Sequence, residues 1–245
     1  MRALLVLTLV SAALGAACGG GVFKPQYEYE EELYLDLDGS ATLNLNASVA
    51  SLVALHGVDL RTDPRERVDR ERVRALFTTP GADATVSLSR RHGRRFVHVS
   101  VDVNDVRELS RLRPFAWSSY RFNRRDDVLE YRQTVGPSAG TVPGHVDWDG
   151  TELVAFKMHL PSEILFHNTG GKIQRGNILE WEQPLADRLK GEPLELRADM
   201  ATESILYTTL LLFGGTIAAA AVTFGAVIWW VARRGRAADA AEPTL

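Results

Sequence analysis

The chain of 245 residues contains a single cysteine, Cys18, which excludes intramolecular disulfides and any zinc site built on several cysteines. It also lacks an excess of positive charge. Lys and Arg total 28 against 31 Asp and Glu, and this net charge of −3 gives no indication of nucleic-acid binding. Apolar residues make up 45% and charged residues 24%, so wholesale disorder is excluded. The length suits one domain or two small ones, after targeting and anchoring segments are subtracted.

Motifs of catalysis and cofactor binding are missing as well. The sequence has no Gly-x-Ser-x-Gly, no phosphate-binding loop and no dinucleotide fingerprint. The six histidines form no pair at the helical spacing of a metal site, and we interpret Asp147 and Asp149 as parts of a turn rather than calcium ligands. We therefore expect no enzyme, no metal and no cofactor.

The N-terminus has the pattern of an export signal. Arg2 is followed by an apolar run at 3–14, by small residues at 15–17 and then by Cys18. This resembles a bacterial lipoprotein signal, in which the cysteine becomes the lipidated first residue of the mature chain. Such signals prefer Leu three places before the cysteine, and that place holds Gly15. We predict a signal peptide at 1–17, lipid attachment at Cys18 and a tether at 18–26; cleavage after Ala17 that leaves a free thiol is the alternative.

The C-terminus carries a long uncharged segment, Ile205–Ala232. As a helix it would extend about 42 Å, more than the hydrocarbon core of a bilayer, which is about 30 Å thick. Basic residues follow at once (Arg233, Arg234 and Arg236), so the positive-inside rule places the C-terminus in the cytoplasm. We predict a transmembrane helix at 204–232 and a cytoplasmic tail at 233–245.

This helix also carries small residues at the spacing that lets two membrane helices pack closely. They are Gly214, Ala218, Ala221 and Gly225, and a membrane protein partner could bind along them. The span opposes transfer to an outer membrane, because extraction would expose its apolar surface to water. We therefore expect a single-pass protein of the cytoplasmic (inner) membrane with residues 27–203 outside the cell.

Between the ends, strand patterns outnumber helical ones. Alternation predicts strands at 27–37 and 41–47 joined at Asp38-Gly39, with Tyr29, Leu33 and Leu35 on one face. Further strands are predicted at 84–89, 96–103, 115–122, 128–135, 152–160, 163–167, 177–182 and 192–200, with a loop at 136–150. Connections are too short for crossovers, so the predicted class is α+β with an antiparallel sheet and two or three short helices.

Three segments have helical signals. Ser48 is the predicted N-cap and Gly57 the end of the first. The second is expected to run from Asp63 to about Phe77, with Asp63 and Glu66 at capping-box spacing. Asn104 is the predicted cap of the third.

The densest basic cluster lies at a predicted hairpin tip. It comprises Arg90, Arg91, Arg94 and Arg95 around Gly93. Contact with anionic lipid headgroups is one interpretation. A turn kept soluble by its charge is the other.

The sequence resembles the mycobacterial LppM lipoprotein family. The resemblance rests on Leu160-Pro161-Ser162, on Gly176-Asn177 leading to Trp181, and on the order of signal, β-rich domain and single span. It implies an envelope-exposed domain that binds membrane lipids or glycolipids. We expect a membrane-anchored binding module for lipid or envelope components, and the alternative is a structural or partner-binding subunit of an inner-membrane complex.

Overall fold

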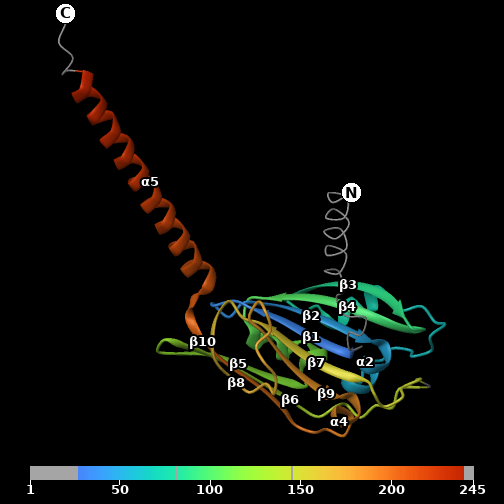
Figure 1. Ribbon diagram of the computed structural model, residues 1–245. Coiled ribbons are helices and arrows are strands. Elements are labelled where there is room, and N and C mark those ends of the chain that lie inside the picture. Colours follow the sequence, from blue (N-terminus) through green and yellow to red (C-terminus); the bar gives the residue numbers. More distant parts are fainter. Residues whose placement is uncertain (1–26, 81, 145, 240–245) are drawn as a thin grey trace, which may run out of the picture.

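The computed structural model describes residues 27–80, 82–144 and 146–239, which form two β-sheets and a long C-terminal helix (Figure 1). The predicted signal peptide, Cys18 and the tether lie outside the described residues. One sheet has the strand order β3-β4-β2-β1-β7-β9 and the other β5-β6-β10-β8. In Figure 1 strands β3, β4, β2 and β1 of the six-stranded sheet lie above β5, β6 and β8 of the four-stranded one.

The strands are β1 (Tyr27–Leu35), β2 (Ala41–Ser48), β3 (Ala82–Arg91), β4 (Arg94–Val103), β5 (Ser118–Arg125), β6 (Val128–Val135), β7 (Leu153–His159), β8 (Ser162–His167), β9 (Ile178–Pro184) and β10 (Leu194–Ser204). The helices are α2 (Val49–His56), α3 (Arg70–Phe77), α4 (Leu185–Leu189) and α5 (Ile205–Asp239), with 3-10 turns η2 (Val106–Arg111) and η3 (Arg113–Phe115). The α+β class and the apolar C-terminal helix are thus confirmed.

Strand pairing departs from the expected antiparallel pattern at one point. β1 pairs antiparallel with β2 but parallel with β7, where Tyr34 lies opposite His159. The prediction considered only short connections between consecutive strands. The chain instead enters the four-stranded sheet through β5 and β6 and then returns through the long loop at 136–152, which provides the crossover.

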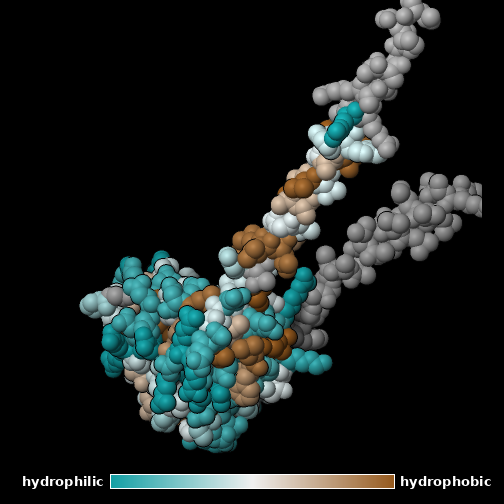
Figure 2. Space-filling view, turned by 90° about the vertical axis from the view of Figure 1, so that its left-hand side faces the viewer, coloured by the Kyte–Doolittle hydropathy of each residue, from teal (hydrophilic) through white to brown (hydrophobic). Residues whose placement is uncertain are grey.

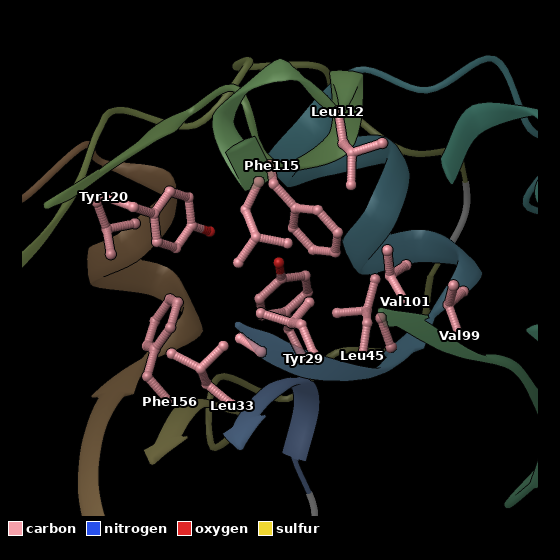
Figure 3. Packing of buried hydrophobic residues seen from close by; sticks show 14 of the residues in the cluster. Tyr29, Leu33, Leu45, Val99, Val101, Leu112, Phe115, Tyr120 and Phe156 are labelled. Atoms are coloured by element: carbon pink, nitrogen blue, oxygen red, sulfur yellow. The ribbon is translucent and has the colours of Figure 1, made fainter. Parts of the chain in front are cut away.

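The hydrophobic core lies between the two sheets. Figure 3 shows Tyr29, Leu33 and Leu45 of the six-stranded sheet together with Phe115 and Tyr120, and all five are buried. A side-chain contact joins the layers directly, because Gln133 of β6 donates from Nε2 to Oε2 of Glu31 on β1 over 3.2 Å. Packing of the two sheets therefore buries the carboxyl group of Glu31 in the interior.

The helix caps confirm one prediction and correct two. Ser48 caps α2 by accepting from the backbone N–H of Ser51, and Gly57 ends this helix at a φ of 61°, a left-handed conformation that favours glycine. The second helix does not begin at Asp63. At Asp63 a single turn forms, in which the N–H of Glu66 donates to the carbonyl of Asp63 over 3.2 Å. The helix itself begins after Asp69, whose carboxylate accepts from the N–H groups of Glu71 and Arg72. Likewise Asp105, and not Asn104, caps η2.

Helix α5 projects from the end of β10, and its residues Ile205–Val231 are long and apolar enough to cross a membrane. This span is exposed along its length. The N–H of Ile205 donates to the carbonyl of Pro161 over 3.1 Å, which fixes the start of α5 beside the end of β7. We call this end of the six-stranded sheet, with Tyr34 and His159, the helix-proximal end.

Candidate ligand-binding pocket

A pocket of about 730 Å³ lies at the opposite end of the six-stranded sheet. Four segments line it: the β3–β4 turn with the residues after it (92–95), the start of α2 (48–50), the segment 62–65, and Gly144, Val146 and Asp147 of the long loop. Its position follows from register, because Ala41 lies opposite Val103 near α5 whereas Ser48 lies opposite Phe96 at the far end. The length of β4, ten residues or about 33 Å, separates the pocket from the helix-proximal end.

The wall of the pocket combines apolar and charged side chains. Val49 is buried and Val146 half-buried, and together they give the pocket an apolar part. Arg65 and His92 are exposed at its edge, and Asp63 and Asp147 add negative charge. Such a mixture is typical of small-molecule sites, which are mostly apolar with a few placed polar groups.

The β3–β4 turn that forms one wall is a tight two-residue turn. His92 and Gly93 have φ angles of 47° and 77°. Both values are positive, as a type I′ hairpin turn requires. The predicted hairpin tip is therefore confirmed, and the turn directs Arg94 and Arg95 back toward the body of the domain.

Arg94 connects three segments at the base of the pocket. Its Nη1 lies 2.5 Å from Oε1 of Glu28, a carboxylate of β1 with no exposed surface, and its Nη2 donates to the carbonyl of Asp147 over 2.7 Å. Glu28 also accepts from Nε1 of Trp148 over 3.2 Å, and Oε1 of Glu152 lies 3.5 Å from Arg94. This ion pair between half-buried Arg94 and buried Glu28 holds the long loop against the start of β1.

Arg95 has a similar role on the other side. Its side chain is buried and donates to the backbone carbonyls of Glu66 and Arg61, so it holds the segment between α2 and α3. Burial lowers the pKa of the Arg95 guanidinium. Arg94 and Arg95 thus shape the pocket through contacts within the domain.

The other two basic residues of the cluster face solvent. Arg90 donates from Nη2 to the carbonyl of Pro64, and the guanidinium of Arg91 lies 5.3 Å from the ring centroid of Phe96. Contact of the cluster with lipid headgroups stays a prediction, and Arg90 and Arg91 are the two residues exposed enough to make it. It would require the six-stranded sheet to lie along the bilayer, because the tip and α5 are at opposite ends of that sheet.

A second polar cluster lies inside the core. The carboxyl group of Glu31 accepts hydrogen bonds from Tyr29 and Gln133, and Tyr131 donates to Oε1 of Gln133 over 2.9 Å. Burial raises the pKa of Glu31 to about 7, although the hydrogen bonds from Tyr29 and Gln133 favour the carboxylate. Burial also lowers the pKa of His56, whose ring lies 5.2 Å from that of Tyr29, to about 3.

Sequence reasoning missed Glu28 and Glu31 as interior groups. A signal for Glu31 was present, since it lies between Tyr29 and Leu33 on the face predicted to be buried. Glu28 belongs to the opposite, solvent-facing parity, and its burial depends on Trp148 and Arg94, which are 120 and 66 residues away. No local pattern indicates those contacts.

Comparison with known proteins yields a distant structural similarity. No protein-family model and no curated protein matches the sequence. Among solved structures, the folded domain of the Mycobacterium tuberculosis protein LppM, determined by NMR, is similar at a TM-score of 0.42 and 11% identity, covering 74% of this chain and 94% of that one. This is a distant structural relationship only, and no ligand or site is carried over from it.

Proposed function

We propose that this protein is a membrane-anchored binding module whose domain lies outside the cytoplasm and whose α5 crosses the cytoplasmic membrane. The cytoplasmic orientation of the C-terminus follows from Arg233, Arg234 and Arg236 directly after the span. The ligand is a lipid or other amphiphilic envelope component with an anionic group. It binds in the pocket at the far end of the six-stranded sheet.

The pocket itself is the observation that supports this proposal best. Its volume of about 730 Å³ falls within the range of about 300–1,000 Å³ that drug-sized ligands occupy. Val49 and Val146 offer contact to an apolar portion, and Arg65 and His92 face the place where a charged portion would emerge. The Glu28–Arg94 ion pair keeps these walls in position before a ligand arrives.

Filling the pocket tests the proposal. Ala50 lines the pocket from α2, so Ala50→Trp should displace the ligand, whereas Ala116→Trp adds the same side chain at an exposed position outside the pocket. We expect mass spectrometry of protein purified in mild detergent to detect an amphiphile with wild type and with Ala116→Trp, and to detect much less with Ala50→Trp. Equal amounts with all three proteins would contradict binding in this pocket.

The alternative function, a partner-binding subunit of a membrane complex, has one observation in its favour. Gly214, Ala218, Ala221 and Gly225 share a face of α5, and a Cβ added at either glycine would have nothing within 4 Å. If this face binds a partner, Gly214→Leu should abolish a cross-linked complex that Leu212→Ala, a change at an exposed position on the opposite side of the same helix, leaves intact. Absence of any cross-linked complex with wild type would remove support for this alternative.

A further inference from the structure

Three arginines lie side by side on the outer face of the four-stranded sheet. Arg121 of β5 is directly opposite Arg132 of β6, and Arg132 is directly opposite Arg197 of β10. Neighbouring strands are about 4.8 Å apart, so the three side chains start within about 10 Å. Like charges directly opposite each other destabilise a sheet. Stability of the fold therefore gives no reason for this arrangement, which we call the arginine row.

Acidic neighbours compensate the row unevenly. Nη2 of Arg197 lies 3.0 Å from Oδ2 of Asp199, a short ion pair. Nη2 of Arg132 is 3.9 Å from Oε2 of Glu130, at the limit of an ion pair, and Glu130 is also 3.5 Å from Arg125. Arg121 has no acidic partner within the described part of the chain. The positive charge of the row is therefore least compensated at its β5 end, where Arg121 lies.

A hollow of about 230 Å³ lies over the arginine row. The three arginines line it together with the hydroxyl-bearing Ser119 and Thr134, both exposed, and Glu195 brings one negative charge to its border. Guanidinium groups bind phosphate and sulfate oxygens through two parallel N–H···O bonds, and hydroxyl groups can donate to the remaining oxygens. The hollow has room for one such group and not for a large ligand.

We propose that the arginine row is an oxyanion site that binds the phosphate or sulfate group of an ester through Arg121 and Arg132, with Arg197 completing its positive side. The site is distinct from the pocket described above, because it lies on the other sheet. A phosphorylated solute and a phospholipid headgroup would present the same chemistry to these residues. The charge arrangement serves binding at the expense of sheet stability.

The first test uses the full-length protein in nanodiscs of phosphatidylcholine, with inorganic phosphate as the probe. The thermal unfolding midpoint should rise with phosphate concentration, and potassium chloride at equal ionic strength should not reproduce the rise. Arg121→Gln and Arg132→Gln should each weaken phosphate binding by about tenfold or more, since each removes charged hydrogen bonds. Arg113→Gln, at an exposed arginine outside the row, removes the same charge and should bind phosphate like wild type.

Stability without phosphate separates binding from a structural role. At low salt, Arg121→Gln should unfold at the wild-type midpoint or up to about 3 °C higher, because like-charge repulsion is relieved. Among the described residues Arg121 has no ion pair to lose, so this variant remains informative even if Arg132→Gln fails to fold. A midpoint several degrees lower for Arg121→Gln would make the row a structural element and overturn the proposal.

A second arm identifies the source of the oxyanion. If the ligand is a lipid headgroup, nanodiscs that contain phosphatidic acid should raise the wild-type midpoint without added phosphate, and Arg121→Gln should remove this rise. If the ligand is a free solute, only inorganic phosphate has the effect. Equal responses of wild type, Arg121→Gln and Arg113→Gln in both arms, or no response to either probe, would overturn the proposal.

Discussion

Replacing Glu31 by Gln should change how the unfolding free energy of this protein depends on pH. Burial between the sheets raises the pKa of Glu31 to about 7, against an ordinary value of 4.5 for an exposed glutamate. Between these pH values the folded protein retains a proton that the unfolded chain has released. The contribution of Glu31 to stability is therefore fully present below about pH 4.5 and is lost as the pH rises toward 7.

The two pKa values set the size of the effect. Each tenfold change in an ionisation constant corresponds to about 1.4 kcal/mol, so the difference between 4.5 and about 7 corresponds to about 3 kcal/mol. For a domain of this size, 1 kcal/mol moves the thermal midpoint by roughly 2–4 °C. We expect the midpoint of Glu31→Gln relative to wild type to rise by roughly 6–12 °C between pH 4.5 and pH 7.5.

His56 has the opposite dependence. Burial lowers its pKa from 6.5 to about 3, so its contribution is present above about pH 6.5 and is lost as the pH falls toward 3. In wild type the two slopes oppose each other between about pH 4.5 and 6.5, and the stability profile should be nearly flat there. In Glu31→Gln the slope of His56 remains, so stability should rise with pH over this interval.

Circular dichroism of the detergent-solubilised full-length protein, heated at a series of pH values, measures these midpoints. Glu163→Gln, at an exposed position on β8, is the matched control and should differ from wild type by the same amount at every pH. The test is whether the difference in midpoint between Glu31→Gln and wild type changes with pH. Its size at a single pH is not informative, because altered hydrogen bonds can produce a constant difference. A difference between Glu31→Gln and wild type that stays constant from pH 4.5 to 7.5 would refute the reasoning.

Further predictions concern the ion pair, the basic tip and the two anchors. Arg94→Met should lower the unfolding free energy by about 3–5 kcal/mol because Glu28 is left buried without its partner; urea unfolding followed by tryptophan fluorescence should show it, and a loss below about 1 kcal/mol would contradict it. Replacing Arg90 and Arg91 by Ser should weaken salt-sensitive flotation with anionic vesicles, and unchanged flotation would favour charge that only keeps the turn soluble. A topology reporter fused to the C-terminus should be active only in the cytoplasm; activity outside would reverse the orientation. Cys18→Ser should abolish incorporation of labelled fatty acid, and undiminished labelling would place the lipid elsewhere.

Local patterns predicted most strands because each strand has one apolar face toward the core. In β4, Val97, Val99, Val101 and Val103 alternate with polar residues, and all four are buried as this alternation requires. Ser48 and Gly57 bounded α2 correctly for a similar reason, since a cap acts within one helical turn. Strand alternation and helix caps depend on residues that are close together in the sequence, so both can be predicted from it.

Features that depend on pairing between distant segments were not predictable in the same way. The alternation of β1 does not specify β7 as its parallel partner, because the backbone groups that pair them are identical in every strand. The same holds for Arg121, Arg132 and Arg197: alternation places each on an outer face, but register alone brings them into one row.

The position of β10 has a mechanical consequence. This strand runs directly into α5, yet it is not an edge strand, since β6 and β8 pair with it on its two sides. Figure 2 shows α5 leaving the domain as a narrow stalk. A force that pulls the domain away from the bilayer would therefore act at the same time on the hydrogen bonds between β10 and β6 and on those between β10 and β8. Strand β10 could not separate from the sheet by breaking the bonds to one neighbour alone. We expect detachment under load to require the four-stranded sheet to rupture in one step, at a rate set by global unfolding, which single-molecule pulling on the two ends of the chain would measure.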